Sequence, residues 1–285
     1  MPDAFEIQVR DYLRPVEGSF SYESMVANHL DVDKYRPWAE TINHYHLIKG
    51  ADVFSSGCGS AGDLWVMQDM GAASITGIEV DETLAELART RLRGAGNIKF
   101  DVSTYAGQDL PYDDAQFDII TSIHVIEHVA DASAYLSELL RVLRPGGILF
   151  LDCPNRFYRV EQHTMLPYVH LLPHTLRDIL LRLIARNPSP IGVSPFRDKC
   201  GALIGMKTPF AAQIMHFLKS MQNRFPHHTV DAYFHDYGSF RKPYGKSRLL
   251  NAQSIYRHAS AFRLVVCRNT QHDVASEATR DACTC

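Results

Sequence analysis

The sequence lacks the features that would point to a membrane or to nucleic acid. It has no charge-free apolar run of about 18 residues, the length that a membrane-spanning helix needs. Its formal net charge at pH 7 is only −3, so we expect no broad basic surface and no nucleic-acid partner. Residues 1–14 mix acidic, basic and apolar side chains without the apolar centre of a signal peptide. We therefore expect a cytoplasmic protein without membrane insertion.

Cysteine is also sparse, with six among 285 residues, and its spacing is irregular. The six positions are Cys58, Cys153, Cys200, Cys267, Cys283 and Cys285. A scattered set of this kind does not predict a disulfide framework and is typical of a reducing compartment. Cys283 and Cys285 offer two ligands, fewer than a tetrahedral zinc site requires, so we expect no metal.

What the sequence does contain, from residue 51 onward, is a regular alternation of strands and helices. Strands are predicted at 51–55, 74–80, 98–102, 117–123 and 148–152. Helices are predicted at 63–70, after Asp81, which can cap the helix that follows it, and at 133–143. The strand at 117–123 is nearly all apolar in its centre, as a strand buried on both faces should be. This alternation predicts a doubly wound, mostly parallel sheet.

The alternation breaks after Pro154, and this break sets the expected domain boundaries. Helices are predicted at 174–187 and 209–224, and we interpret 155–228 as a helical cap inserted over the strand ends. Strands at 230–237 and 262–268, with a helix at 252–259 between them, would complete a seven-stranded sheet. The expected organisation is an N-terminal helical lid at 1–50, a sheet domain at 51–154 and 229–270, the cap, and a flexible tail at 271–285.

A glycine-rich loop follows the first predicted strand. Gly57, Gly59 and Gly62 satisfy the pattern Gly-x-Gly-x-x-Gly. Glycine lets the backbone turn tightly and approach a ligand, and the next helix offers its positive N-terminus. Such a loop can face either the amino-acid part of a methyl-donating cofactor or the pyrophosphate of a dinucleotide. The loop alone therefore leaves both cofactor classes open.

Glu79 stands at the end of the second predicted strand, 17 residues beyond Gly62. This is close to the spacing of an acid that binds ribose next to a glycine loop. A carboxylate at that edge can accept hydrogen bonds from both ribose hydroxyls. NAD enzymes share this acid, so it indicates a nucleoside ligand but does not distinguish a methyl-donating cofactor from a dinucleotide.

Three segments resemble the class I S-adenosylmethionine-dependent methyltransferases, especially the group that includes ubiquinone- and menaquinone-pathway enzymes. They are Val-Phe-Ser-Ser-Gly-Cys-Gly at 53–59, the stretch at 109–112 with 116–120, and Glu-His-Val at 127–129 followed by Arg-Val-Leu-Arg-Pro-Gly-Gly at 141–147. The last set is specific, and a dehydrogenase would have no reason to carry it. The resemblance spans roughly residues 50–155 and implies an α/β, Rossmann-like fold with S-adenosylmethionine as cofactor.

Two positions depart from the pattern of this family. The family usually has Asp or Glu where Ser55 stands, and that acid helps to hold the methionine ammonium. Ser55 can offer a hydrogen bond but no charge. Ala61 stands where a third glycine is common, and Gly62 follows one place later. Both departures bear on cofactor affinity rather than on the fold.

The resemblance implies cofactor contacts along the carboxyl edge of the sheet. Backbone groups at 104–107 would reach the adenine edge, and Ile123 and His124 would lie beside the sulfonium. The expected cofactor-binding residues are Ser55, Gly57, Cys58, Gly59, Glu79, Val80, Thr104, Ala106, Gly107, Ile123 and His124.

The expected acceptor site draws on the cap and the N-terminus. His163 could act as a general base near neutral pH, and Glu161 could orient it or bind substrate; the alternative is that both only anchor the cap. Tyr22, His128 and His170 are expected substrate contacts, with ordinary packing as their alternative. The helix at 174–187 carries both apolar and arginine side chains. It could therefore line a lipophilic pocket, touch a membrane surface, or form a core or oligomer contact.

The sequence thus predicts transfer of a methyl group to an apolar small molecule, such as a prenylated or aromatic natural product or pathway intermediate, at oxygen, nitrogen or carbon. The alternatives are an NAD-dependent oxidoreductase, which the segments at 127–129 and 141–147 disfavour, and a non-catalytic nucleotide-binding module, which Ser55 suggests. Methylation of nucleic acid is disfavoured by the absence of a basic domain. The acceptor, the pathway and a homo-oligomeric state remain open.

Overall fold

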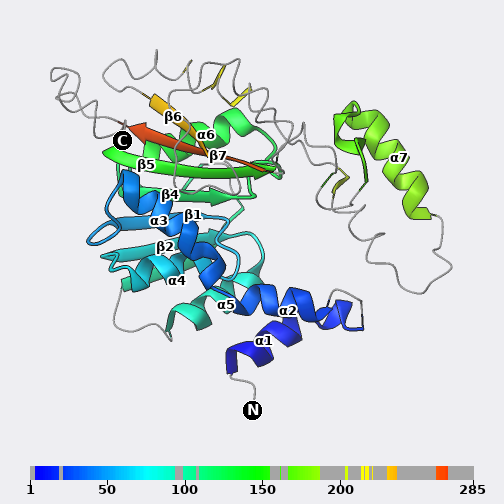
Figure 1. Cartoon of the computed structure of the whole chain (residues 1–285), viewed down its shortest axis with the longest axis horizontal. Helices are drawn as coiled ribbons and strands as arrows, with labels where there is room; N and C mark the ends of the chain where they lie inside the picture. The colour runs from blue at the N-terminus through cyan, green and yellow to red at the C-terminus, as the bar shows by residue number, and fades with distance from the viewer. Residues whose placement is uncertain are drawn as a thin grey trace.

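The computed structural model describes the greater part of the chain up to residue 186 and two strands beyond it. The described residues are 4–18, 22–93, 99–106, 109–154, 161, 166–186, 203–204, 213–214, 216–217, 220, 230–235 and 261–268. Figure 1 shows a central sheet with helices on both of its faces. No helix within this part of the chain is long and apolar enough to cross a membrane.

The strands and helices alternate from residue 52 to residue 154. The strands are β1 (Asp52–Ser56), β2 (Ser74–Glu79), β3 (Lys99–Thr104), β4 (Phe117–Ile123), β5 (Leu143–Pro154), β6 (Val230–His235) and β7 (Ala261–Arg268). The helices are α1 (Ala4–Tyr12), α2 (Tyr22–Leu30), α3 (Arg36–Tyr45), α4 (Gly62–Asp69), α5 (Glu82–Arg93), α6 (Ala132–Val142) and α7 (His174–Arg186). The predicted helices at 209–224 and 252–259 lie largely or wholly outside the described residues.

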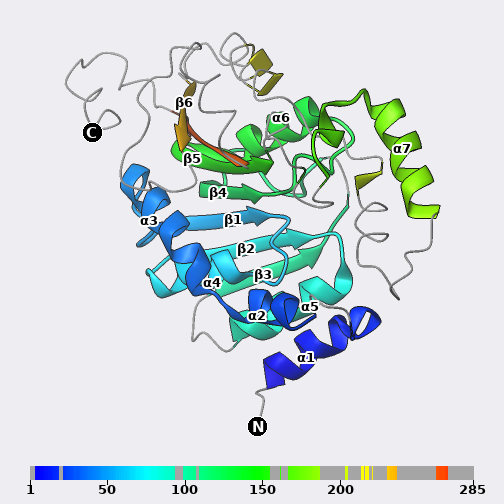
Figure 2. The ribbon, with the colours of Figure 1, turned by 45° about the vertical axis from the view of Figure 1, so that its right-hand side comes forward.

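The seven strands form one sheet in the order β3-β2-β1-β4-β5-β7-β6. β1 to β5 are mutually parallel, and β7 runs antiparallel between β5 and β6. Strand order reverses between β1 and β4, which Figure 2 shows side by side at the centre. In open α/β sheets this reversal leaves a crevice at the carboxyl ends of the two strands. The predicted α/β, Rossmann-like fold with a mostly parallel sheet is confirmed.

The central strands are apolar because helices cover both of their faces. Val53 and Phe54 in β1, and Ile119 and Ile120 in β4, are fully buried. Successive residues of a strand point to opposite faces, so each pair contributes to two separate cores. Val53 and Ile119 pack with α3, α4 and α5, whereas their neighbours pack with α6.

Local signals set where the covering helices begin. The Asp81 carboxylate accepts hydrogen bonds from the backbone of Thr83 at 2.8 Å and Leu84 at 3.1 Å, which confirms its predicted role as the cap of α5. Asp131 caps α6 in the same way. Both caps lie on loops that leave the carboxyl edge, so they also fix the edge at which a ligand would bind.

The Pro-Gly-Gly turn at 145–147 differs from its prediction. We predicted a helix to 143 and a strand from 148, but α6 ends at Val142 and β5 begins at Leu143. Leu143 already pairs with Phe117, and the register then shifts before Ile148 pairs with Ile119. The turn is therefore an irregularity within β5. A side chain at Gly147 would lie 2.5 Å from the carbonyl oxygen of Asp118, so this close approach requires glycine.

The N-terminal helices lie against α4 and α5. Val9, Leu13, Tyr22 and Val26 form a small core with Leu87 of α5. Figure 2 shows α1 and α2 beside α5, at the end of the sheet where β3 lies. The predicted role of residues 1–50 as a lid stays a prediction. We also expected Tyr22 to contact substrate, but its ring is buried in this packing. The apolar faces of α1 and α2 pack against α5, and Nδ1 of His29 in α2 lies 3.1 Å from the Ser60 hydroxyl of the glycine loop.

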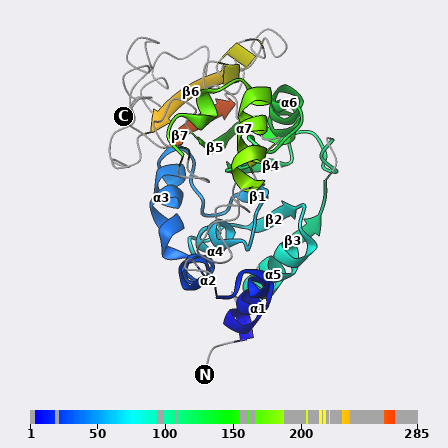
Figure 3. The ribbon, with the colours of Figure 1, turned by 90° about the vertical axis from the view of Figure 1, so that its right-hand side faces the viewer.

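After β5 the described chain continues in a one-turn helix, Val169–Leu171, and in α7. Val169, Leu181 and Leu203 form a small apolar cluster of their own. Figures 1 and 3 place α7 beyond the carboxyl ends of the strands, so α7 faces the edge at which the central crevice opens.

Candidate functional site

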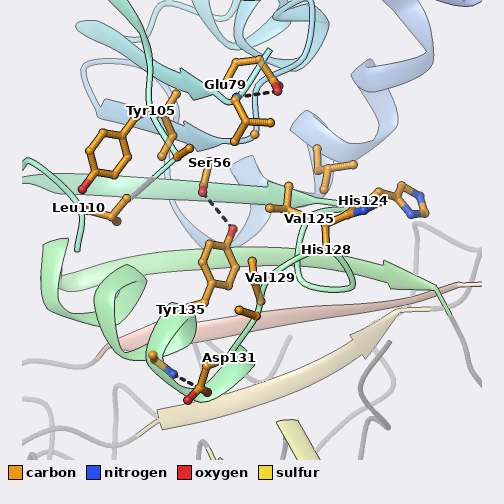
Figure 4. Close-up of a pocket in the computed structure, with 17 residues that line it drawn as sticks. Ser56, Glu79, Tyr105, Leu110, His124, Val125, His128, Val129, Asp131 and Tyr135 are labelled. Atoms are coloured by element: carbon orange, nitrogen blue, oxygen red, sulfur yellow. Dashed lines mark hydrogen bonds between the residues drawn. The ribbon is translucent and has the colours of Figure 1, made fainter. Parts of the chain in front are cut away.

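A cavity of about 570 Å³ opens at the carboxyl ends of β1, β2 and β4 (Figure 4). Binding sites for small molecules commonly have this size. Its lining begins at Ser56 and Gly57, includes Glu79 at the end of β2, and reaches His124 and His128 after β4. The first residues of α6 close the remaining side. The cavity thus occupies the crevice at which the strand order reverses.

The glycine loop is tied to β2 and meets the cavity with bare backbone at Gly57. The backbone N–H groups of Gly57 and Cys58 both donate to the carbonyl oxygen of Ile78 at 2.9 Å. Gly57 has a φ of +70°, and a Cβ there would lie 2.4 Å from Cγ2 of Val125. The backbone therefore approaches the cavity at a position where a side chain would be both strained and obstructed.

The next loop residues show why the glycine pattern is shifted by one place. Ala61, at the position where a third glycine is common, has a left-handed backbone with φ of 56°. Gly62 begins α4, and a Cβ there would lie 2.4 Å from Cε2 of Tyr35 and 2.9 Å from a guanidinium nitrogen of Arg91. Gly62 therefore allows the N-terminal helices to pack closely and has no direct part in the cavity.

Glu79 lines the cavity and holds the glycine loop. One carboxylate oxygen accepts from the backbone of Gly59 at 2.8 Å, and the other accepts from Val80 at 2.8 Å and Asp81 at 3.3 Å. Each oxygen of a carboxylate offers about two acceptor sites. Glu79 can thus order the loop and still accept hydrogen bonds from a ligand, as expected for a ribose-binding acid.

Ser55 does not face this cavity, which corrects our expectation for it. Its hydroxyl donates to the Asp63 carboxylate at 2.9 Å, and Thr121 of β4 donates to the same oxygen at 2.9 Å. Burial raises the pKa of Asp63, and the two hydroxyl donors partly oppose that rise. Where the family carries an acid on the first strand, this chain has Ser55 on β1. The buried acid of this chain is Asp63, which lies on α4 and contacts Ser55.

Ser56 faces the cavity instead, because neighbouring residues of a strand point to opposite faces. The Tyr135 hydroxyl lies 3.0 Å from the Ser56 hydroxyl and 2.7 Å from that of Ser122, as Figure 4 shows for the first pair. Burial raises the pKa of Tyr135 to about 12, so the phenol stays protonated. We did not predict Ser56, although it lies in the segment at 53–59, because the family resemblance drew attention to its neighbour Ser55. Tyr135 lies outside the motifs.

His124, on the loop after β4, lies between two buried acidic side chains. His124 has a left-handed backbone with φ of 55°, and its N–H donates to the carbonyl oxygen of Asp152 at 2.9 Å. Its ring lies between two fully buried carboxylates: Nδ1 is 3.5 Å from Glu127, and Nε2 is 3.8 Å from Asp152. Neither carboxylate was predicted from the sequence.

The structure brings part of the predicted cofactor set together around the cavity. Its lining includes Gly57, Glu79, Val80, Ala106, Ile123 and His124, together with the predicted substrate contact His128. Gly59 contributes through its backbone bond to Glu79. These positions share the carboxyl edge of the sheet, which is why motif order along the chain could identify them.

Other predicted residues lie away from the cavity. Cys58 is buried beneath Gly77, and burial raises the pKa of its thiol. The Thr104 hydroxyl bonds to Glu82 on α5. Glu161 is buried, and its backbone N–H donates to the carbonyl oxygen of Leu166 at 3.0 Å. Gly107, His163 and the side chain of His170 lie outside the described residues.

Comparison with known sequences gives matches that cover part of the chain. The methyltransferase domain family matches residues 54–151. A demethylmenaquinone methyltransferase of Tropheryma whipplei is 30% identical over 143 residues, 49% of this chain and 55% of that protein. A ubiquinone biosynthesis O-methyltransferase of Sinorhizobium fredii is 31% identical over 109 residues, 38% of this chain and 43% of that protein. The chain spans about half the length of these curated relatives.

Solved structures extend the likeness to the whole fold. A crystal structure of an S-adenosylmethionine dependent methyltransferase from Mesorhizobium loti has a TM-score of 0.54 and 12% sequence identity. The match covers 84% of this chain and 100% of that one. At this identity the likeness establishes the fold alone.

Proposed function

We propose that this chain, whose residues 54–151 form a domain of the class I S-adenosylmethionine-dependent methyltransferases, transfers a methyl group to an apolar small-molecule acceptor. The family and the cofactor that the three sequence segments predicted are confirmed by the domain match and by the relatives. That match covers 98 of 285 residues, from 54 to 151, so the activity of the whole chain is a proposal.

One observation carries the proposal: the cavity joins Gly57, Glu79 and His124 at the point where the strand order reverses. The residues present fit the cofactor. Gly57 presents bare backbone to the cavity for the amino-acid part, and the Glu79 carboxylate retains acceptor capacity for ribose hydroxyls. Ile78 and Leu110 offer apolar surface to an adenine ring.

The protein's part in the reaction is placement. When bound, S-adenosylmethionine supplies an electrophilic methyl group, so the protein has to hold the acceptor atom in line with it. Gly57 and Glu79 fix the two ends of the cofactor site relative to each other, because Glu79 also binds the backbone of Gly59. The cavity wall at Val125 and Val129 is apolar and suits an apolar acceptor in the remaining space.

We propose that the segment at 155–228 forms a cap and binds the acceptor. Of its described residues, α7 lies beyond the carboxyl edge of the sheet (Figure 3), and Leu181 of α7 packs with Val169 and Leu203. The walls of the cavity and the two quinone-pathway relatives favour an apolar acceptor, such as a prenylated phenol. His163 and Glu161 stay proposals for the acceptor side, and His163 lies outside the described residues.

Calorimetric titration with S-adenosylhomocysteine tests the cofactor site. We expect micromolar binding by the wild type and at least about tenfold weaker binding by Glu79→Gln, since hydrogen bonds to a charged acceptor are lost. Glu86→Gln is the matched control, because Glu86 is exposed on α5 and pairs with Arg89. It should bind as the wild type does.

NAD is titrated in the same experiment as the alternative ligand. Binding of NAD in place of S-adenosylhomocysteine would favour an oxidoreductase, and binding of neither would favour a non-catalytic module. Transfer of a labelled methyl group from S-adenosylmethionine to prenylated phenols then tests the acceptor class. Equal labelling of a short, unprenylated phenol would contradict an acceptor site built for apolar molecules.

A further inference from the structure

We propose that the buried carboxylates of Glu127 and Asp152, which flank His124 behind the cavity, form a cation-recognising wall that favours the sulfonium cofactor over its neutral product. The inference rests on the proposed function, because it concerns the same cavity. It assigns a role to two acids that the sequence motifs left without one.

Glu127 is the central observation. Its side chain is fully buried, and neither carboxylate oxygen has a hydrogen-bond partner among the described residues. A buried carboxylate is costly unless it is hydrogen-bonded or meets opposite charge. Its ion pair within the described chain is with His124, at 3.5 Å from Nδ1, a separation that leaves the carboxylate poorly compensated.

Asp152 adds a second negative charge to the same place. It lies in the buried carboxyl-terminal part of β5, pairs in register with Ile123 of β4, and lies 3.8 Å from Nε2 of His124. One histidine thus stands between two fully buried carboxylates. With both carboxylates ionised, these three side chains together carry a net charge of −1 when the His124 ring is protonated and −2 when it is neutral.

The charge of Glu127 reaches the cavity lining. Burial and, to a smaller extent, the charge of Glu127 raise the pKa of Tyr135, whose ring lines the cavity. His124 lines it directly and is about one-third exposed, with 36% of its side chain accessible. The negative charges therefore lie just behind the residues that close the β4 side of the cavity.

This side is where the sulfonium is expected. The family resemblance places the sulfonium beside Ile123 and His124, and both line the cavity. A ligand with a positive charge there is attracted by the two carboxylates, and in a low-dielectric wall such attraction is weakly screened. Transfer of the methyl group leaves S-adenosylhomocysteine neutral, so the product loses this attraction and is released more readily.

The test compares two ligands that differ by one methyl group and one charge. Dissociation constants for S-adenosylmethionine and S-adenosylhomocysteine are measured by calorimetry, in the absence of acceptor, on the full chain and its Glu127→Gln variant. We expect the wild type to prefer the charged ligand and Glu127→Gln to lower that preference by about tenfold. The affinity for S-adenosylhomocysteine should change little.

Further variants separate charge from structure. Asp152→Asn should lower the preference in the same direction, and Glu127→Asp, which keeps the charge, should restore most of it. Glu79→Gln should lower the affinity for both ligands by the same factor, since both carry the ribose. Removing an uncompensated buried charge should leave the melting temperature of ligand-free Glu127→Gln unchanged or raise it by about 2–4 °C.

The outcomes distinguish this inference from the proposed function. If both ligands bind and the preference is the same in the wild type, Glu127→Gln and Asp152→Asn, the cation-recognising wall is refuted while the cofactor site stands. If the wild type binds neither ligand, the proposed function fails, and the inference fails with it.

Discussion

At Gly57 the backbone and its neighbours exclude a side chain for two separate reasons. The residue is left-handed, with φ of +70°, and a Cβ would lie 2.4 Å from Val125. The left-handed backbone costs an L-residue about 1–2 kcal/mol. The contact with Val125 adds a steric cost, and it lies on the cavity wall.

Gly57→Ala should therefore lower both stability and ligand affinity. We expect a loss of about 2–4 kcal/mol in the free energy of unfolding, from the left-handed backbone and the overpacking together. Displacement of Val125 should also weaken binding of S-adenosylhomocysteine. Denaturant unfolding and calorimetry measure the two effects.

Gly50 supplies the control for this substitution. It is also left-handed, with φ of +81°, but nothing lies within 4 Å of a Cβ built there. Gly50→Ala should cost stability alone, by the smaller backbone amount. Equal losses of affinity in Gly50→Ala and Gly57→Ala would show that the contact with Val125 has no effect on the cavity.

The residue scale is also where the sequence was least informative. The family resemblance placed Ser55 at the cofactor, yet in the strand it points away from the cavity and Ser56 points toward it. A shift of one residue along a strand changes the face, and the motif does not specify which face a ligand uses. Likewise Asp63 meets Ser55 only because α4 folds back over β1, which no spacing rule states.

At the scale of elements, the start of α4 couples the glycine loop to the N-terminal helices. Gly62 lies under the ring of Tyr35 and beside Arg91. The Arg91 guanidinium donates to the carbonyl oxygen of His29 on α2. Burial raises the pKa of Tyr35 to about 12 and lowers that of Arg91 to about 10, in keeping with a closely packed contact.

A double-mutant cycle tests this contact. Alanine has a higher helix propensity than glycine by about 1 kcal/mol, so Gly62→Ala on propensity alone should stabilise α4. We expect the opposite in the wild type, because the new methyl group meets Tyr35. In a Tyr35→Ala background the same substitution should become neutral or stabilising, as urea unfolding would show. Destabilisation of equal size in both backgrounds would contradict the role assigned to Tyr35.

Helices whose apolar residues recur at a regular spacing were predicted well, whereas the boundary between a helix and the next strand was not. α5 and α6 carry apolar residues at helical spacing behind an aspartate cap, and both were located to within a residue or two. The start of β5 was missed by five residues, since Leu143 could end a helix or begin a strand. Pairing with Phe117 in three dimensions decides between them.

For the molecule as a whole, ligand binding and stabilisation of the sheet are located at opposite edges of the sheet. The carboxyl edge holds the cavity. Near the amino edge, Arg144 pairs with Asp52 of β1 at 3.0 Å and with Asp118 of β4 at 2.7 Å. The Ser74 hydroxyl of β2 donates to Asp52, so this network connects the central strands to one another.

Arg144→Ala should lower stability without changing the affinity for S-adenosylhomocysteine. These side chains are partly exposed, so after solvent screening we expect a loss of about 1 kcal/mol in the free energy of unfolding. Thermal unfolding and calorimetry on the same sample measure both quantities. A fall in affinity as large as that of Glu79→Gln would contradict the division of tasks between the edges.

The architecture at this scale followed from few rules. Alternating strands and helices predict parallel neighbours, and the crossover rule then brings β1 and β4 together at the centre. The site follows from that reversal. The placement of α1 and α2 beside α5 did not follow, because an amphipathic helix shows which of its faces is buried but not which surface buries it.

The position of β7 bears on how the protein emerges from the ribosome. β7 lies between β5 and β6, although β6 precedes it in the sequence. A nascent chain synthesised as far as β6 has no neighbouring strand for that segment, and the edge of β5 stays open until residues 261–268 are translated. During that interval the open edge is available for pairing with other chains. Completion of the sheet is thus a late event, set by translation.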